Sequence, residues 1–473
     1  MKKFREIAVT LTLDFIYFVL AWYIFYLLRF ELGIVSDPEG GEPRQLLLPG
    51  IVIAVYWIVI FSIFGLYRKL YLISRFDEIL RVAKITIIGT LILFFILFID
   101  SLGWTAENLS MAKTVTLVYW LTVFILVGTN RFILRTIQKI RVQKGKGLHR
   151  ALIVGVGLTA QSVYEKLERH KESGMNVLGY ISGKNGQIDP ETTAVQSDKI
   201  LGNLENLNDI IKKNDVQDII VALEEIDRDY LIHVLDQVDV PDVSIKILPD
   251  FHQVISGLNQ TNQIFGLPLI EVMPDPMPSW EKFVKRMLDI LLSLLALAVM
   301  AVPMVIIMVI IRLTSSGPAI YQQERVGKYG KVFTIFKFRT MSQDAEVASG
   351  PTWAEQDDPR ITKVGYWLRK LRLDEFPQFF NVLKGEMSLV GPRPERQFFV
   401  DEFKKEIPLY TRRLRVKPGI TGWAQVKWKY DTSFEDVSEK TKYDLFYVEN
   451  MSLRMDIKIL INTLVTVLKG KGQ

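Results

Sequence analysis

Long apolar runs separated by charged loops fill the first 150 residues of the chain. Four such runs cover residues 8–28, 46–66, 83–99 and 114–134. Each is close to the ~20 residues that a helix needs to cross the hydrocarbon core of a bilayer. The first run is too long for a cleaved signal peptide and lacks a small-residue cleavage site. We therefore expect a four-helix transmembrane part over residues 1–150.

The charge of the connecting loops predicts the orientation of these helices. Lysine and arginine are concentrated in MKKFRE, RKLYLISRFDEILRVAK and RFILRTIQKIRVQKGKGLHR, whereas the other two loops lean acidic, with Glu31, Asp37, Asp100 and Glu107. The positive-inside rule places the N-terminus and everything after the fourth helix in the cytoplasm. Asp14 falls inside the first run, where we expect it to hydrogen-bond to a neighbouring helix.

The middle section, residues 151–272, alternates short apolar strands with helical stretches. ALIVGVGLTAQSVYEKL is typical of a buried strand, a glycine turn and a helix, and NVLGYI, DIIVALEE and VSIKILP predict further strands. This alternation predicts a Rossmann-like α/β domain with a mainly parallel sheet. Gly155 and Gly157 match the first glycines of a dinucleotide fingerprint, but no acidic residue ends the next strand. We therefore expect a degenerate nucleotide-binding fold with a structural or regulatory role.

The third section, residues 279–473, opens with the apolar run LLSLLALAVMAVPMVIIMVII, which has basic residues on both sides. A single crossing would carry the second basic flank across the membrane, against the positive-inside rule. Pro303 lies near the middle of the run, where it removes a backbone hydrogen bond and kinks a helix. We expect a re-entrant membrane hairpin over about residues 283–312, broken at Pro303, with a plain kinked span as the alternative.

Composition narrows the chemistry that this chain can perform. Hydrophobic residues make up 49% of the chain, which favours a membrane protein. The chain has no cysteine, so disulfides, thiolate metal sites and a cysteine nucleophile are excluded. Its four histidines all precede Gln253. Chemistry in the third section must therefore use carboxylates, lysines, hydroxyls or a metal.

Cationic residues crowd the segment that follows the apolar run. They are Arg325, Lys328, Lys331, Lys337, Arg339, Arg360, Lys363, Arg369, Lys370, Arg372, Arg393 and Arg396. Cations at this density beside a membrane indicate lipid headgroups or phosphorylated substrates. The pattern favours membrane lipids and phosphorylated small molecules as partners, and no nucleic acid.

Two adjacent acids, Asp374 and Glu375, stand among these cations and just before Pro377. Proline is favoured in the first turn of a helix, so FPQFFNVL predicts a helix with both acids at its N-terminus. That end of a helix attracts phosphate. One carboxylate can attack phosphorus to form an acyl-phosphate, and the second can help to hold a divalent cation such as Mg²⁺.

Long motifs in the third section resemble the catalytic domain of the monotopic polyprenol-phosphate phosphoglycosyltransferases. They are KRMLDI, then GPAIYQQERVGKYGKVFTIFKFRTM, LRLDEFPQFFNVLKGEMSLVGPRP and KPGITGWAQV, in the family's order. The four preceding spans and the degenerate nucleotide fold resemble its large bacterial subclass. These enzymes start the repeat units of exopolysaccharide, capsule or O-antigen, with undecaprenyl phosphate as the acceptor of glucose or galactose phosphate.

The resemblance implies a reaction and a location. Asp374 attacks the β-phosphate of a UDP-sugar, releases UMP and forms a phosphosugar-aspartyl intermediate, and undecaprenyl phosphate then takes the phosphosugar. The resemblance further implies a mainly helical monotopic catalytic domain on the cytoplasmic face of the bacterial inner membrane. The identity of the sugar and the oligomeric state stay open, with a homodimer as one candidate.

The resemblance also assigns roles to individual residues. Asp374 and Glu375 form the catalytic dyad and hold Mg²⁺. Lys337 steadies the dyad, Arg369 and Arg393 contact phosphates, and Pro392 and Pro394 shape the nucleotide pocket. Arg325 and Arg339 are weaker candidates for the same binding site.

Two other classes of protein share parts of this pattern. Membrane-anchored nucleotide-sugar dehydratases or epimerases have similar spans and a similar middle domain. They need a second glycine-rich fingerprint and a Tyr-x-x-x-Lys pair, which the sequence after residue 279 lacks. A non-catalytic membrane sensor would explain the spans but not the dyad with its arginines. Finally, the C-terminal stretch DIKILINTLVTVLKGKG and the basic stretch KKEIPLYTRRLRVKPG are both candidates for the membrane interface.

Overall fold

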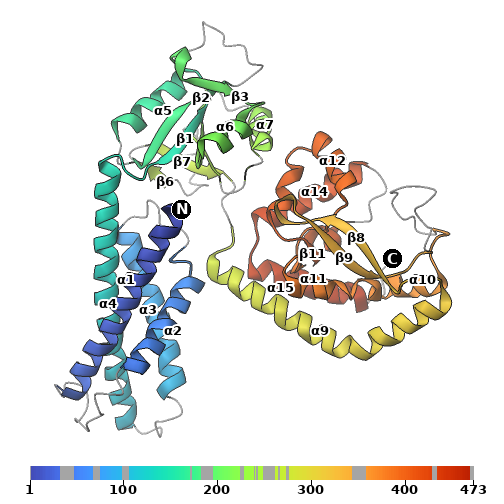
Figure 1. The fold of residues 1–473 in the computed structure, drawn as a ribbon, viewed down its shortest axis with the longest axis horizontal. Coiled ribbons are helices and arrows are strands. Elements are labelled where there is room, and N and C mark those ends of the chain that lie inside the picture. The colour runs from blue at the N-terminus through green and yellow to red at the C-terminus, as the bar shows by residue number, and fades with distance from the viewer. Residues whose placement is uncertain are drawn as a thin grey trace.

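The computed structural model describes residues 2–31, 47–67, 75–98, 106–170, 173–182, 195–223, 228–238, 240, 243–248, 262–264, 267–272, 276–342, 358–428 and 434–468. Three parts follow one another along the chain (Figure 1). A bundle of long helices comes first, and its last helix leads into a twisted sheet. A third part follows, with the helix α9 along its lower edge in this view.

The N-terminal part consists of α1 (Lys2–Tyr26), which continues as a short π-helical turn, η1 (Leu27–Glu31), and of α2 (Leu47–Ile63), α3 (Arg75–Phe98) and α4 (Ala106–Gln143). By length and composition, segments of α1, α3 and α4 can each cross a membrane, and α2 is a shorter apolar helix. The four apolar helices predicted for this part are confirmed. Helix α4 continues well beyond its apolar run, to 38 residues.

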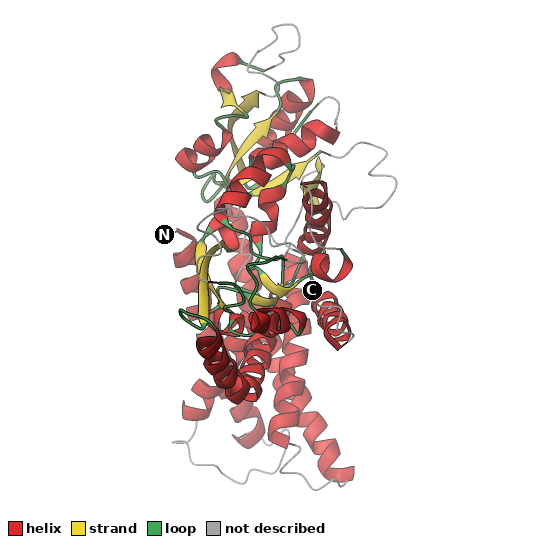
Figure 2. Ribbon diagram, turned by 90° about the vertical axis from the view of Figure 1, so that its right-hand side faces the viewer, coloured by secondary structure: helices red, strands yellow, loops and turns green. Residues whose placement is uncertain are grey.

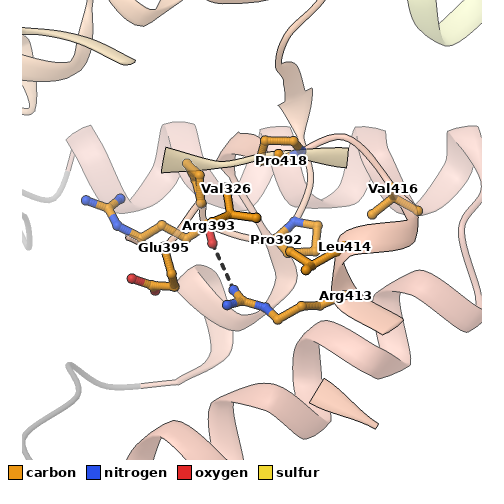
Figure 3. A pocket seen from close by; sticks show the side chains of 10 residues that line it. Val326, Pro392, Arg393, Glu395, Arg413, Leu414, Val416 and Pro418 are labelled. Atoms are coloured by element: carbon orange, nitrogen blue, oxygen red, sulfur yellow. Dashed lines mark hydrogen bonds between the residues drawn. The ribbon is translucent and has the colours of Figure 1, made fainter. Parts of the chain in front are cut away.

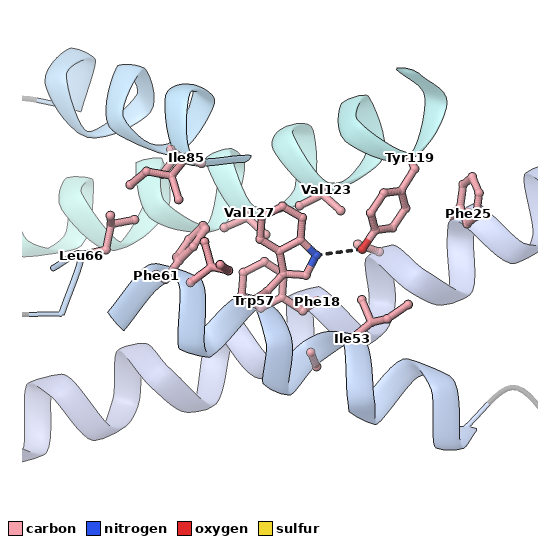
Figure 4. Close-up of a cluster of buried hydrophobic side chains, with 14 of the residues drawn as sticks. Phe18, Phe25, Ile53, Trp57, Phe61, Leu66, Ile85, Tyr119, Val123 and Val127 are labelled. Carbon is pink, nitrogen blue, oxygen red and sulfur yellow. Dashed lines mark hydrogen bonds between the residues drawn. The ribbon is translucent and has the colours of Figure 1, made fainter. Parts of the chain in front are cut away.

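Aromatic side chains fill the centre of this bundle (Figure 4). Trp57 of α2 is fully buried and donates its indole N–H to the hydroxyl of Tyr119 on α4 at 2.8 Å. Its ring stacks on Phe18 of α1 at 5.7 Å between centroids. An indole that finds a polar partner within an apolar core suits a helix bundle in lipid, where backbone groups are already paired.

A polar cluster around Asp14 joins α1, α4 and the turn after α2. Its carboxylate accepts hydrogen bonds from Tyr67 at 2.9 Å and from Asn130 of α4 at 2.9 Å, and it pairs with Arg131. Asp14 and Arg131 are almost completely buried, so each charge is neutralised by the other. The prediction of an interhelical role for Asp14 is confirmed.

The middle part is a seven-stranded sheet with the order β3-β2-β1-β4-β5-β7-β6. Its strands are β1 (His149–Val154), β2 (Met175–Ser182), β3 (Ile200–Asn203), β4 (Asp218–Val221), β5 (Ser244–Ile247), β6 (Asn262–Ile264) and β7 (Leu267–Val272), and its helices are α5 (Leu158–Arg169), η4 (Ser197–Lys199), α6 (Leu207–Asn214) and α7 (Arg228–Gln237). Strands β3, β2, β1, β4 and β5 pair in parallel, and β7 and β6 run antiparallel at the edge. The predicted mainly parallel α/β sheet is confirmed.

Successive residues of β1 supply the two faces of this sheet. Leu152 and Val154 join one apolar cluster with α6 and α7, and Ala151 and Ile153 join another with α5. Gly155, which follows β1, has a φ of +131° and approaches β4 closely, since a Cβ there would lie 2.2 Å from the carbonyl oxygen of Ala222. Backbone packing alone therefore requires this glycine.

The third part carries short strands among many helices, which Figure 2 shows facing the viewer. Its elements are α9 (Ser279–Thr314), β8 (Ile320–Val326), η5 (Lys328–Gly330), β9 (Val332–Phe338), α10 (Lys363–Lys370), η6 (Leu373–Glu375), α11 (Gln378–Lys384), β10 (Ser388–Val390), α12 (Gln397–Glu406), η7 (Tyr410–Arg415), β11 (Gly419–Thr421), α13 (Trp423–Lys427), α14 (Phe434–Glu449) and α15 (Leu453–Leu468). Strands β8 and β9 form an antiparallel hairpin, and β10 pairs in parallel with β11.

Three side chains near the start of α9 clamp it to the rest of the third part. Asp289 accepts hydrogen bonds from the hydroxyl of Ser388 at 3.1 Å and from the backbone N–H of Leu389 at 2.9 Å. Lys285 donates to the carbonyl of Val390 at 3.0 Å, and Arg286 donates to two carbonyls at the end of α11. We name Lys285, Arg286 and Asp289 the α9 clamp. It joins the helix to β10 and α11.

The far half of α9 contacts the same part of the molecule. Met304 and Ile311 are buried in an apolar cluster with Phe338 of β9 and Leu368 of α10. The helix continues through Pro303, so the predicted break at this residue is wrong, and Figure 1 shows the helix bent, with the third part above both arms. Most of its other apolar side chains are exposed, among them Leu295, Val299, Val302 and Leu313.

Removal of the Asp289 carboxylate should destabilise the third part. In Asp289→Ala, a buried hydroxyl and a buried N–H lose their acceptor, which should reduce the free energy of unfolding by about 2–4 kcal/mol. Thermal unfolding of the purified protein in detergent, followed by tryptophan fluorescence, measures the change. Asp401→Ala on the exposed face of α12 is the control and should leave the midpoint nearly unchanged. Equal midpoints for the two variants would contradict the clamp.

Candidate functional site

The two acids predicted to do chemistry lie in a single turn between helices. Helix α10 ends at Lys370, and Arg372 adopts a left-handed conformation with a φ of 55° that redirects the chain into η6. Asp374 and Glu375 occupy η6, and Pro377 caps α11. The helix predicted from FPQFFNVL is therefore confirmed, but it begins at Gln378. The acids lie in the 3₁₀ turn before it, because Pro377 takes the cap position.

Two cations bind one oxygen of Glu375. Lys337, on β9, lies 3.1 Å from Oε1, and Arg393, after β10, lies 2.8 Å from the same oxygen. Glu375 is buried, with 7% of its surface exposed. The carboxylate of Asp374 is also buried, and among the residues that the structure describes no group donates a hydrogen bond to it. The two neighbouring acids thus have different surroundings.

These surroundings move the two pKa values apart. Burial raises the pKa of Asp374, and the adjacent charge of Glu375 raises it further, against the opposing effect of Lys337, Arg393 and Arg369. Burial would also raise the pKa of Glu375, but Arg393 and Lys337 hold it well below its usual range. Burial lowers the pKa of Lys337, while Glu375 opposes this. Glu375 is therefore the acid that stays ionised with its cations, and Asp374 remains free of such partners.

Arg369 interacts with the dyad, and Arg325 with the loop that carries Arg393. Arg369, on α10, donates its Nε–H to the hydroxyl of Thr340 at 3.0 Å and is close enough to Asp374 for its charge to act on that carboxyl. Burial lowers the pKa of Arg369. Arg325, on β8, donates to the carbonyl of Pro394 at 3.1 Å, so it supports the loop that carries Arg393.

This loop borders a shallow hollow, whose lining includes Arg393 but neither acid of the dyad (Figure 3). The hollow measures about 230 Å³, space open to solvent included, and Pro392, Arg393 and Pro394 line it. Gly391 allows the loop to lie against the segment before β11, since a Cβ there would meet the carbonyl oxygen of Lys417 at 2.4 Å. The predicted nucleotide-pocket prolines and the phosphate-binding arginine thus surround one concave surface.

Arg339 lies apart from the other candidates. Its guanidinium donates to the carbonyl and the hydroxyl of Ser315, at the end of α9. It is buried, and no described contact joins it to Asp374 or Glu375. The structure therefore brings Lys337, Arg369 and Arg393 to the dyad, and it places Arg339 at the end of α9. Arg325, Pro392 and Pro394 belong to the surroundings of the loop that carries Arg393 and have no described contact with either acid.

Sequence reasoning missed the arginine that fixes the backbone at Arg393. Arg413 donates to the carbonyl oxygen of Arg393 at 2.8 Å, as Figure 3 shows, and to Asp444 on α14 at 2.8 Å. The prediction that KKEIPLYTRRLRVKPG lies at the membrane interface is wrong for Arg412 and Arg413, which are 3% and 5% exposed. Acids distant in sequence neutralise them, Asp444 for Arg413 and Glu449 for Arg412. No local pattern could have revealed those partners.

The dyad offers an incomplete but suitable set of ligands for a hard divalent cation. Among the described residues no cluster of three or more histidine, cysteine or acidic side chains could enclose a metal. Magnesium in phosphoryl-transfer sites binds one or two carboxylates and completes its shell with substrate phosphates and water. Asp374, which accepts no hydrogen bond from the described part of the chain, and the second oxygen of Glu375 match that requirement.

Comparisons with known proteins agree on one family. The family model described as bacterial sugar transferase matches residues 280–470, and one described as a CoA-binding domain matches residues 62–249. One relative is the UDP-N-acetylgalactosamine-undecaprenyl-phosphate N-acetylgalactosaminephosphotransferase of Aeromonas hydrophila. The two chains are 42% identical over 230 residues, which are 48% of this chain and 53% of the relative.

Two further relatives match a larger share of the chain. The UDP-glucose:undecaprenyl-phosphate glucose-1-phosphate transferase of Xanthomonas campestris pv. campestris is 33% identical over 355 residues, which are 73% of this chain and 72% of the relative. The undecaprenyl-phosphate galactose phosphotransferase of Salmonella typhimurium is 29% identical over 404 residues, 82% of this chain and 81% of the relative. The chain therefore belongs to the bacterial sugar transferase family, as a membrane-bound transferase of the undecaprenyl-phosphate sugar phosphotransferase class.

Proposed function

We propose that this protein transfers a sugar-1-phosphate from a UDP-sugar to undecaprenyl phosphate and releases UMP. The observation that carries the proposal is the asymmetry of the dyad. Asp374 is a buried carboxylate to which no described residue donates a hydrogen bond, next to an acid that already binds two cations. A nucleophile needs a free lone pair, and a buried anion without donors is more reactive than a solvated one.

The reaction that we propose has two displacements at phosphorus. An oxygen of Asp374 attacks the β-phosphorus of the UDP-sugar, the bond from this phosphorus to the bridging oxygen breaks, and UMP leaves with that oxygen. An oxygen of undecaprenyl phosphate then attacks the same phosphorus and releases Asp374 as a carboxylate. The product is undecaprenyl-diphospho-sugar. This would be the first membrane step of a repeat-unit glycan.

The cations around the dyad have separate tasks in this proposal. Lys337 and Arg393 keep Glu375 ionised and fixed, so that Asp374 is held in one orientation. The guanidinium groups of Arg393 and Arg369 would face the charge that develops on the phosphoryl oxygens. Pro392 and Pro394, which line the hollow of Figure 3, would border the nucleotide.

Asp374 and Glu375 are the residues that would hold Mg²⁺. When bound, the ion would supply positive charge that offsets the pyrophosphate and the leaving UMP. The side chains of this protein then bind and orient the donor, and the buried position of Asp374 limits access of water to the intermediate.

The anchoring of α9 supports a re-entrant mode of membrane insertion. Both arms contact the same part of the chain, the first through the α9 clamp and the second through Met304 and Ile311. The bend near Pro303 lets an apolar helix enter lipid and return, which leaves both basic flanks in the cytoplasm. We propose that the catalytic part lies on the cytoplasmic face of the bacterial inner membrane.

The identity of the sugar is the least determined part of the proposal. The names of the three relatives specify N-acetylgalactosamine, glucose and galactose. We propose UDP-glucose or UDP-galactose as the donor. A dehydratase or epimerase is not favoured, because across the described residues after 276 the strands form only two-stranded sheets and no second nucleotide-binding sheet.

Replacement of Asp374 tests the nucleophile directly. Asp374→Asn keeps the size of the side chain but removes its charge, and it should reduce UMP release from a UDP-sugar at least about 1,000-fold. The assay uses the protein in nanodiscs with undecaprenyl phosphate and measures UMP and lipid-linked radiolabelled sugar together.

Asp401→Asn on exposed α12 provides the matched control and should keep full activity. With the acceptor omitted, mass spectrometry of the unaltered protein should find a phosphosugar adduct on the peptide that contains Asp374. Turnover by Asp374→Asn near the unaltered rate, or UDP as the released nucleotide, would exclude the mechanism.

Removal of divalent cations should stop the reaction. Positive charge at the pyrophosphate contributes several kcal/mol to such transition states, so chelation should lower UMP release more than about 100-fold. Activity should return on addition of Mg²⁺, and a sample treated with chelator already saturated with Mg²⁺ serves as the control. Full activity after passage over a chelating resin would show that the dyad works without a metal.

A further inference from the structure

The middle and third parts of the molecule meet at one turn. The backbone N–H of Leu409, between α12 and η7, donates to a carboxylate oxygen of Asp236 on α7 at 2.9 Å. The side chain of Leu409 packs against the apolar cluster of the middle part that contains Leu207, Val234 and Leu235. The two residues of this hydrogen bond are 173 positions apart in the chain.

Leu409 adopts a conformation that needs support from its surroundings. Its φ is 61°, in the left-handed region that favours glycine. A leucine remains there only where neighbouring groups hold it, and here the Asp236 carboxylate and the apolar cluster provide that hold. The shape of the turn before η7 therefore depends on the middle part.

A chain of hydrogen bonds leads from this turn to the dyad. Tyr410, the next residue, accepts a hydrogen bond from Arg413 at 2.6 Å. Arg413 donates in turn to the carbonyl of Arg393 at 2.8 Å, and Arg393 binds Glu375. Tyr410 and Arg413 are both buried, so neither can move without its neighbours.

Arg412 adds a charge to the same contact. It is 3% exposed, lies 3.7 Å from Glu449 of α14, and interacts electrostatically with Asp236. The acid of the middle part therefore faces both the turn and a buried cation of the third part. Without the side-chain oxygens of Asp236, Arg412 would keep Glu449, at 3.7 Å, as its one acidic partner among the described residues.

We propose that the middle part positions the reacting centre, with Arg413 as the positioning residue that connects the α7–Leu409 contact to Arg393. The proposal rests on the function proposed above, because it takes Arg393 and Glu375 as parts of the transfer site. It gives the middle part a task that requires no nucleotide. Arg413 acts through Arg393 and touches no substrate.

The test uses substitutions at the contact, because a change at buried Arg413 could prevent folding. Asp236→Ala removes the acceptor, whereas Asp236→Asn keeps an acceptor oxygen. Leu409→Asn tolerates the left-handed conformation but loses the apolar contact, whereas Leu409→Met keeps it. Asp209→Ala, on exposed α6, is the control. Each full-length variant is assayed in nanodiscs for UMP release with UDP-glucose, UDP-galactose and UDP-N-acetylgalactosamine.

Asp236→Ala and Leu409→Asn should lower kcat/KM about tenfold, and the two conservative variants and Asp209→Ala should stay within about twofold. Asp236→Ala and Leu409→Asn are then each combined with Arg393→Lys. If the contact acts through Arg393, the double variant should be no worse than Arg393→Lys alone, whereas independent effects would multiply. A merely structural contact would produce multiplication together with a lower unfolding midpoint.

Two results would overturn the proposal: unchanged kcat/KM in Asp236→Ala and Leu409→Asn, or multiplicative losses in the double variants. Asp374→Asn, assayed in parallel, separates this failure from failure of the transferase itself. Activity that survives in Asp374→Asn rejects the transfer mechanism. Activity that is lost there but kept in Asp236→Ala rejects only the role of the middle part.

Discussion

The α9 clamp joins the most lipid-facing helix of the third part to the strand that leads into the transfer site. Asp289 and Lys285 hold Leu389 and Val390 of β10, and Arg393 follows three residues later. The membrane helix and the arginine that binds Glu375 are therefore connected through a few residues of extended backbone. In the membrane placement proposed above, a site built on this strand would keep a constant position relative to the bilayer surface, which suits an acceptor dissolved in lipid.

The two acids of the dyad have different electrostatic surroundings. Two adjacent acids in one buried turn compete for a limited number of cations, and geometry gives both cations to Glu375. Lys337 and Arg393 thereby offset part of the free-energy cost of burying the charge of Glu375. They offset less of this cost for Asp374. In the proposed mechanism, Asp374 would act as the nucleophile because Lys337 and Arg393 pair with Glu375 instead. Lys337 comes from β9 and Arg393 from the segment after β10, so the site depends on elements that meet only in the folded protein.

The sequence was informative where a feature is local and limited where it depends on distant partners. Apolar runs predicted the helices of the first part, and strand–helix alternation predicted the parallel sheet. Adjacent acids before a proline marked the dyad. By contrast, the burial of Arg412 and Arg413 follows from Asp444 and Glu449, which lie more than thirty positions away. Arg339 belongs to the same KFRTM motif as Lys337. It donates to Ser315 instead of the dyad, because it lies beyond the end of β9.

Helix α4 links the bilayer to the middle part without interruption. Its 38 residues span about 57 Å at 1.5 Å per residue, roughly twice the hydrocarbon thickness of a membrane. In the proposed membrane placement, α4 would fix the distance of the middle part from the bilayer, and α9 would fix that of the third part. The contact of Leu409 with α7 connects the middle part to the third part. With α4 and α9 inserted as proposed, a thicker or thinner bilayer would displace the two helices by different amounts and strain that contact, so lipid composition would act on the enzyme mechanically.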